Sequence, residues 1–135
     1  MVNDTISDFL ARIKNGYLAR KSTVSVPYAK ALEKIGELMV ESNYLENMEV
    51  ISQKKDKKTI KKEILLTLKY EGKKPVLQEI VRVSKPGKRV YIKSSRIRPT
   101  LSGFGISIIS TPKGLMTGKE ARKIKLGGEF VCQIW

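Results

Sequence analysis

The segment best equipped for chemistry lies near the C-terminus, where an apolar run ends in small polar residues. It reads Ser110-Thr111-Pro112-Lys113-Gly114. Ser110 and Thr111 can each donate and accept a hydrogen bond, and Gly114 lets a partner approach the backbone closely. With the positive charge of Lys113, these groups suit the 2′-hydroxyls, phosphates and base edges of an RNA groove. Taken alone, the same residues are more typical of an ordinary strand-to-helix turn.

The charge of the whole chain points to a polyanionic partner. Lys and Arg number 27 against 13 Asp and Glu, which gives a net charge of +14 and a pI of about 10.0. Such a surplus favours neutralisation of phosphates and release of condensed counterions. A merely solvated cationic surface is the alternative interpretation, although a field of this size would attract nucleic acid in any case.

The residues that most enzymes and metal sites use are scarce. The chain has no histidine, and Cys132 is its single cysteine. This nearly excludes the usual zinc sites and nucleophile–base pairs, and it rules out an intrachain disulfide. The carboxylates lie mostly on expected helix flanks beside lysines, so no acid–base pair stands out. The sequence therefore predicts no enzyme, no metal site and no cofactor.

The expected environment is the interior of a cell. A lone cysteine fits a reducing compartment. No apolar stretch approaches the length of a membrane span, and the N-terminus does not have the pattern of an export signal. We therefore expect a soluble, intracellular protein without a membrane partner.

The hydrophobic pattern predicts an N-terminal αβαββ lobe over residues 1–72. Helices are expected over 4–18 and 27–43, and strands over 22–26, 46–52 and 59–70. Asn3 or Asp4 would cap the first helix, and Pro27 would open the second. The last two strands form a hairpin with a lysine-rich tip at 54–58. That tip is either a solvated turn that protects an edge strand or a loop that touches RNA phosphates.

Residues 73–135 are expected to form a second lobe, mostly β with one helix, so that the fold class is α+β. A linker is expected at 71–75, strands at 76–83, 89–93, 105–109 and 129–135, a Pro-Gly turn at 84–88 and an irregular segment at 94–103. A helix is expected over 118–125, where Thr117 and Glu120 make a capping-box pattern and Gly127 would end it. The polar segment at residues 110–114 would then lie between a strand and a helix.

Short motifs spread along the chain carry a resemblance to a known family. They read DTISD at 4–8, ARIKN at 11–15, LTLKY at 66–70, RVSKPG at 82–87, GFGI at 103–106, ISTPKGLMT at 109–117, EAR at 120–122 and GGE at 127–129. In this order and spacing they resemble the S8 family of small-subunit ribosomal proteins over essentially the whole chain. The resemblance implies a two-lobe structural protein of the small ribosomal subunit.

The resemblance also sets the expected partners. It implies direct, early binding to the central domain of small-subunit ribosomal RNA, at an irregular stem near an internal loop, and a part in assembling the platform of the subunit. It implies neighbours such as small-subunit proteins five and seventeen. In bacteria it implies repression of the protein's own operon through a messenger RNA that imitates the stem. The expected location is the ribosome of a bacterial cytoplasm or of an organelle such as a plastid.

The resemblance and the residue chemistry together give a set of candidate RNA-binding residues. In the C-terminal lobe these are Tyr91, Lys85, Ser110, Thr111, Lys113, Gly114, Glu129 and Cys132, and in the N-terminal lobe Arg12, Asn15 and Lys30. Glu129 would cap a turn or accept a hydrogen bond from a base amino group, and its place in the family pattern favours the second role. Cys132 lies either near the RNA or in the core as a small hydrophobe. For Tyr91 a half-buried position in a strand is favoured over a platform for RNA.

The chain departs from the family pattern at two positions. Pro112 stands where the family usually carries a second serine. The proline removes a hydroxyl and a backbone N–H and biases Thr111 towards extended geometry, so the contacts open to the loop change. Thr5 replaces a common proline at the start of a helix. The alternative function is a general architectural protein that binds duplexes without site preference, for which the +14 charge alone is enough.

Overall fold

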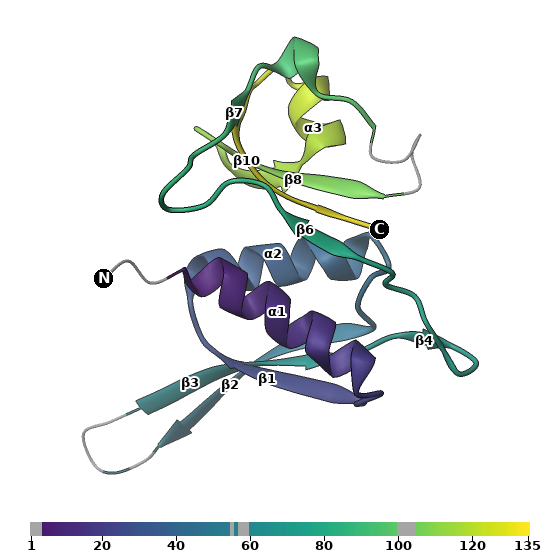
Figure 1. Ribbon diagram of the computed structural model, residues 1–135. Coiled ribbons are helices and arrows are strands. Elements are labelled where there is room, and N and C mark those ends of the chain that lie inside the picture. The colour runs from purple at the N-terminus through teal and green to yellow at the C-terminus, as the bar shows by residue number, and fades with distance from the viewer. Residues whose placement is uncertain (1–3, 55, 57–59, 100–104) are drawn as a thin grey trace. The chain divides into compact units, whose positions relative to one another are not determined.

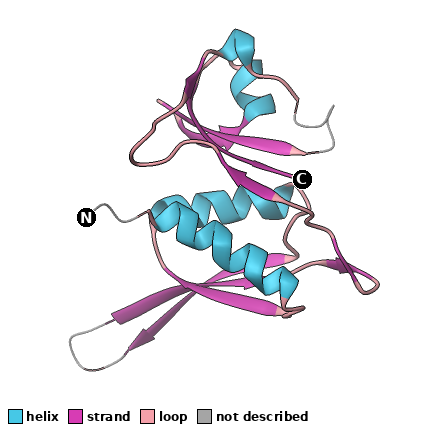
Figure 2. Cartoon of the chain, in the orientation of Figure 1, coloured by secondary structure: helices cyan, strands magenta, loops and turns pink. Residues whose placement is uncertain are grey.

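The computed structural model describes residues 4–54, 56, 60–99 and 105–135. The chain divides into two compact units, which are Asp8–Val76 and Leu77–Trp135 together with the residues before Asp8 (Figure 1). Both units combine helices with strands, which confirms the predicted α+β class (Figure 2). The lobe boundary at residues 72 and 73 stays a prediction. In the described part of the chain, no helix is long and apolar enough to cross a membrane.

The unit Asp8–Val76 packs two helices on one face of a three-stranded antiparallel sheet (Figure 1). Its elements are α1 (Thr5–Leu18), β1 (Thr23–Pro27), α2 (Lys30–Glu41), β2 (Asn47–Lys54), β3 (Ile60–Thr67), β4 (Tyr70–Glu71) and β5 (Lys74–Pro75). The sheet order is β1-β3-β2. The lysine-rich tip at 54–58 lies largely outside the described residues.

Apolar residues at helical spacing form the core of this unit. The buried side chains on α1 are Phe9, Leu10, Ile13 and Tyr17, and those on α2 are Leu32, Ile35, Leu38 and Met39. Ile64 and Leu66 of β3 are fully buried, and the pairing of β3 with both neighbours puts it in the centre of the sheet. A helix stripe and one face of a sheet thus bury each other, as the pattern predicts.

The starts of the two helices differ in how well the sequence predicted them. Asp4 caps α1 as expected, because its Oδ1 accepts a hydrogen bond from the backbone N–H of Ser7 at 3.0 Å. The prediction that Pro27 opens α2 is wrong. Pro27 is the last residue of β1 and α2 begins at Lys30. Since β1 is an edge strand, it tolerates a residue without a backbone N–H.

The expected linker at 71–75 has secondary structure of its own. Tyr70 pairs with Pro75 and Glu71 pairs with Lys74, which makes a small antiparallel hairpin. Gly72 takes φ +65° in its turn. Such a φ favours glycine, so the Glu-Gly-Lys sequence formed a tight turn instead of an irregular connection.

The other unit is built on an antiparallel sheet with one short helix. Its elements are β6 (Ile80–Arg82), β7 (Tyr91–Ile92), the 3₁₀ helix η1 (Ser94–Arg96), β8 (Ile106–Thr111), β9 (Gly114–Thr117), α3 (Gly118–Lys123) and β10 (Gly128–Ile134). The sheet order is β6-β10-β8-β9, and β7 also pairs with β10. Ile97, Ile109, Met116 and Ala121 form a buried cluster that Ile92 and Phe130 border. Ala121 belongs to α3, so this cluster packs the helix against the sheet.

The predicted turns of this unit have mixed outcomes. The Pro-Gly turn is confirmed, since Lys85 and Lys88 exchange backbone hydrogen bonds of 3.0 and 2.9 Å. The cap at Thr117 is also confirmed, because its side chain accepts from the backbone N–H of Glu120 at 3.2 Å. Gly127 does not end α3. The helix is capped by Ile124, and Lys125 takes the left-handed conformation with φ 60°.

The prediction that the polar segment joins a strand to a helix is wrong. Strand β8 continues to Thr111, the chain turns at Pro112 and Lys113, and β9 returns from Gly114. Proline fixes the φ that the first central turn position needs, and Gly114 supplies φ +112° on the far side. The segment is therefore a tight β-hairpin followed directly by α3.

Candidate nucleic-acid interface

An open concave surface lies where β7, β10 and β8 run side by side. Tyr91 pairs with Glu129, and Glu129 pairs with Ser110, so these three candidate residues form a row across the sheet. Residues paired across neighbouring strands share a face of the sheet. The surface encloses about 680 Å³ and is lined by Tyr91, Ile92, Lys93, Ser94, Ser110, Pro112, Gly127, Gly128 and Glu129. The row therefore brings together three of the predicted site residues.

Tyr91 is exposed, which corrects the favoured expectation of a half-buried strand aromatic. The residue is 71% exposed at the edge of the sheet. β7 has only two residues and, among the described strands, pairs with β10 alone, so its other edge is open. An exposed aromatic ring beside polar groups can stack on an unpaired base.

Thr111 holds the hairpin turn instead of presenting its hydroxyl to solvent. Its Oγ1 donates to the backbone oxygen of Gly114 at 2.9 Å and accepts from the backbone N–H of Lys113 at 3.1 Å. The residue is only 8% exposed. Lys113, in contrast, is exposed at the tip together with Pro112. Thr111 thus shapes the loop that carries the lysine.

Two glycines allow the strands of the site to approach each other. A Cβ on Gly128 would lie 2.0 Å from the backbone oxygen of Ser110, and one on Gly127 would lie 2.4 Å from the backbone oxygen of Ile92. Neither contact is sterically possible. The Gly-Gly pair was part of the family motif, but its packing role could only be seen once β7 and β8 were placed beside β10.

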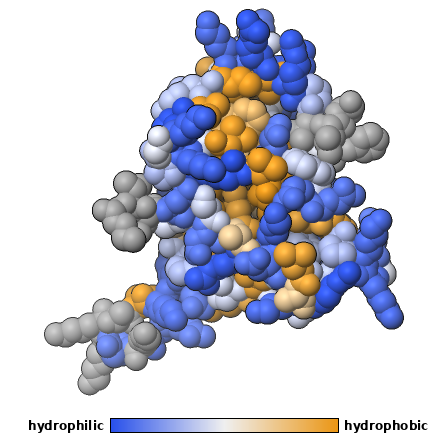
Figure 3. Space-filling model, viewed as in Figure 1, coloured by the Kyte–Doolittle hydropathy of each residue, from blue (hydrophilic) through white to orange (hydrophobic). Residues whose placement is uncertain are grey.

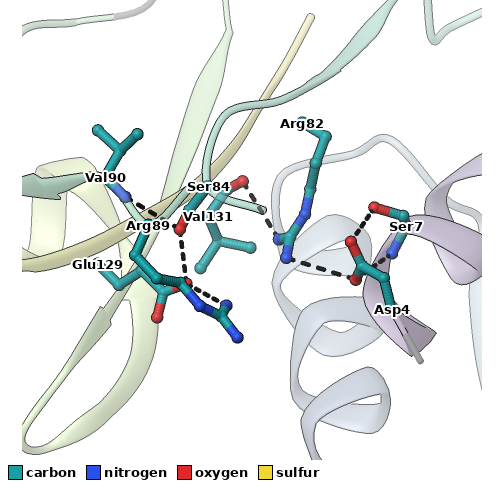
Figure 4. Close-up of polar contacts among 8 residues, drawn as sticks. All are labelled: Asp4, Ser7, Arg82, Ser84, Arg89, Val90, Glu129 and Val131. Carbon is teal, nitrogen blue, oxygen red and sulfur yellow. Dashed lines mark hydrogen bonds and ion pairs between the residues drawn. The ribbon is translucent and has the colours of Figure 1, made fainter. Parts of the chain in front are cut away.

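Glu129 is held by two residues that were not among the candidates. Its Oε1 accepts from Ser84 Oγ at 2.7 Å and from a terminal nitrogen of Arg89 at 2.8 Å (Figure 4). Ser84 is fully buried, and its Oγ accepts from the backbone N–H of Val90 at 3.2 Å. Ser84 lies in a motif that carried the resemblance, but no local signal connects it to a glutamate 45 residues later.

Cys132 lies in the core of the sheet. This agrees with the alternative in which Cys132 is a small buried hydrophobe. The residue is fully buried on β10, and burial raises the pKa of its thiol from 9.0 to about 12.

We expect Cys132 to react with a thiol-exchange reagent on the order of 1000-fold more slowly in the native protein at pH 8 than in denaturant, because the thiolate is the reactive form. Absorbance of the released chromophore would measure both rates. Equal rates would contradict the burial.

The remaining candidates are not among the residues that line the concave surface. Lys85 is exposed in the Pro-Gly turn. In the unit Asp8–Val76, Arg12 and Asn15 are exposed on α1 and Lys30 is exposed at the start of α2. Arg12 donates to Asp8 at 3.0 Å, one helical turn away, and to the backbone oxygen of Ser25 at 3.3 Å. Its guanidinium is thus directed by protein contacts.

The described lining of the concave surface includes an aromatic ring, two hydroxyls and a cation, from Tyr91, Ser94, Ser110 and Lys93. On the side of the chain drawn in Figure 3, hydrophilic residues cover much of the face and hydrophobic residues are exposed between them. Within the described ranges, no three His, Cys, Asp or Glu residues gather closely enough to hold a metal ion. Exposed cations with an aromatic ring and hydroxyls are the groups that RNA-binding surfaces use.

Comparison with known proteins identifies the family. The sequence model of the family described as Ribosomal protein S8 matches residues 4–135. Small ribosomal subunit protein uS8 from Dictyoglomus turgidum is 47% identical over 134 residues, which are 99% of this chain and 98% of the relative. The same protein from Mycoplasmopsis synoviae is 46% identical over 134 residues, with the same coverage. Small ribosomal subunit protein uS8c from Rhodomonas salina is 42% identical over 137 residues and the full length of both chains.

These relatives confirm two of the sequence-based predictions. The first is the family, because the match extends over nearly the whole of every chain. The second is a ribosomal location, in a bacterial cytoplasm or an organelle. The chain therefore belongs to the ribosomal protein S8 family, and it is a structural component of the ribosome and not an enzyme.

Proposed function

We propose that the chain is a constituent of the small ribosomal subunit that binds the central domain of small-subunit ribosomal RNA directly and helps to assemble the platform. The observation that carries the proposal is the row of Tyr91, Glu129 and Ser110 on one open surface. The net charge of +14 supplies the attraction to phosphates. Membership of the family supports the ribosomal target.

The chemistry of the row suits an irregular stem better than a regular one. A-form RNA hides its base edges in a deep, narrow groove, so recognition relies on the minor groove, on distorted shape and on unstacked bases. The row offers an aromatic ring, a carboxylate acceptor and a hydroxyl that both donates and accepts. Those groups can bind an unstacked base and a 2′-hydroxyl. A surface with cations alone would not distinguish an RNA that presents these groups from any other RNA.

The cations have a different part in the proposal. Lys113 at the hairpin tip and Lys85 in the Pro-Gly turn would contact phosphates, and so position the RNA without reading its sequence. Arg12, Asn15 and Lys30 would make similar backbone contacts to an adjacent RNA helix.

Family membership also supports a proposal of further partners. We propose that the chain contacts neighbouring small-subunit proteins, such as proteins five and seventeen. In a bacterial source we also propose that the chain binds the messenger RNA of its own operon and represses its translation. Such a messenger would have to present the same irregular stem, because only then could the row of Tyr91, Glu129 and Ser110 recognise both RNAs.

The proposal is tested by the affinity of the chain for two RNAs at physiological salt. One is a stem–internal-loop fragment of the central domain, and the other is a regular hairpin of equal length. We expect a preference of about 1000-fold for the irregular stem, the lower end of specific over non-specific binding. Equal affinities would instead support a general architectural protein, for which charge alone decides binding.

A further inference from the structure

Glu129 is an unusual group to find in the binding surface of a cationic protein. Of the described residues that line the concave surface, it is the one that is acidic. A carboxylate repels phosphates and the carbonyl oxygens of bases, so it adds nothing to general RNA affinity. It can accept a hydrogen bond from an exocyclic amino group, as acidic side chains do from cytosine.

The directions of the hydrogen bonds around Ser84 are fixed. The backbone N–H of Val90 can only donate, so Ser84 Oγ accepts from it, at 3.2 Å. The single hydroxyl proton of Ser84 is then available for Glu129 Oε1 at 2.7 Å (Figure 4). Because Ser84 is fully buried, bulk water does not compete for this proton. The backbone thus sets the orientation of the hydroxyl, and the hydroxyl sets that of the carboxylate.

Arg89 completes the arrangement from the other side. Its guanidinium donates to the same oxygen, Oε1, at 2.8 Å, and a guanidinium cannot accept. Two charge-assisted bonds on one oxygen restrain the carboxylate strongly. Both bonds use Oε1, and Glu129 lines the concave surface, so its second oxygen, Oε2, can accept from a ligand there.

We propose that Ser84 and Arg89 are positioning residues that make Glu129 a fixed acceptor for an exocyclic amino group of an unpaired base. This inference rests on the proposed function. The base would be an unpaired adenine, cytosine or guanine, and uracil is excluded because it has no amino group. Tyr91 and Ser110 flank Glu129 in the row, so a base that stacks on the ring of Tyr91 can direct its amino group at Oε2.

As a positioning residue, Arg89 would have a role that its charge does not suggest. Arg89 does not line the concave surface, and its side chain is 44% exposed. An exposed arginine in a cationic chain would ordinarily be counted as a phosphate contact. A phosphate contact affects all RNAs alike and contributes to the salt dependence, whereas a positioning residue affects the discrimination at one base. These two readouts separate the two roles.

The experiment uses the full chain and the irregular stem fragment. Each unpaired base is replaced in turn by an analogue without its amino group: purine riboside for adenosine, inosine for guanosine and pyrimidin-2-one riboside for cytidine. For the wild-type protein we expect about tenfold weaker binding at one position. In Arg89→Ala and Ser84→Ala this penalty is expected to shrink below about twofold, whereas Arg89→Lys should keep part of it.

Lys88→Ala is the matched control for charge. Lys88 is the exposed neighbour of Arg89, and its replacement removes the same positive charge. It should leave the analogue penalty at about tenfold, whatever its effect on total affinity. Glu129→Gln covers the case in which Arg89→Ala or Ser84→Ala does not fold. It nearly keeps the shape of the side chain. Its amide oxygen would accept from Ser84 and Arg89, which leaves the NH₂ group, a donor that cannot accept from a base amino group, at the position of Oε2, so the penalty should be lost.

The outcomes separate this inference from the proposed function. A full analogue penalty in Arg89→Ala, or no penalty at any position in a wild-type protein that still prefers the irregular stem, would overturn the inference alone. Equal wild-type affinity for the irregular stem and the regular hairpin would overturn the proposed function together with the inference.

Discussion

Gly128→Ala is expected to abolish specific RNA binding by forcing apart the strands that carry the site. The added Cβ would lie 2.0 Å from the backbone oxygen and 2.8 Å from the carbonyl carbon of Ser110. Both atoms belong to the backbone of a central strand and cannot rotate away, so β8 or β10 has to move. We expect a loss of about 3 kcal/mol in the free energy of unfolding, at the upper end for overpacking. The shift would also separate Ser110 from Glu129. Urea denaturation and stem binding measure the two effects.

Gly87→Ala is the control for this substitution. A Cβ on Gly87 meets no atom within 4 Å, and its φ lies outside the left-handed region. Its free energy of unfolding should therefore remain within about 0.5 kcal/mol of the wild-type value. If Gly128→Ala were as stable as Gly87→Ala and bound the stem equally well, the close approach of β8 and β10 would not be needed for the site.

The double variant Ser110→Ala with Thr111→Ala is expected to bind the irregular stem about 100-fold more weakly. Ser110 would lose the hydroxyl that the row presents to RNA. Thr111 would lose the two hydrogen bonds that hold the turn, so Lys113 would no longer be fixed in place. Affinity for the regular hairpin should change little, because non-specific binding depends on charge. The preference for the stem is the quantity to measure.

A second double variant separates the two contributions. Ser110→Ala with Thr111→Ser keeps a hydroxyl in the turn and removes only the hydroxyl at residue 110, so we expect a loss of about tenfold. Lys113→Ala should lower both affinities alike and reduce the salt slope by about one unit. An unchanged preference for the stem in both double variants would place the specific contacts elsewhere.

The sequence predicted the features that depend on neighbouring residues. Helical spacing located α1, because its buried residues repeat with the period of the helix. The caps at Asp4 and Thr117 follow from a side chain and a backbone N–H three residues apart. Ser110 and Glu129 could be named because motifs and chemistry were visible in the sequence. Their placement in one row across the sheet was not part of that prediction.

The features that depend on pairing between distant strands could not be read in this way. Arg89 and Ser84 bind Glu129 although they precede it by 40 and 45 residues in the sequence. The spacing of polar and apolar residues along the chain does not indicate such a contact. The exposure of Tyr91 depends on β7 being a short edge strand, which is a property of the sheet and not of the local sequence. The hydrogen bonds of Thr111 within the turn could not be predicted either, because they require β9 to return at Gly114.

The measurement that tests the central claim most directly is a chemical footprint of the chain on whole small-subunit ribosomal RNA. Backbone cleavage at physiological salt would report which nucleotides the wild-type protein protects. We expect protection to be concentrated on one irregular stem of the central domain, and to disappear there in Ser110→Ala with Thr111→Ala. Protection spread over many duplexes, or equally strong in the variant, would show that charge and not the row of Tyr91, Glu129 and Ser110 decides where the protein binds.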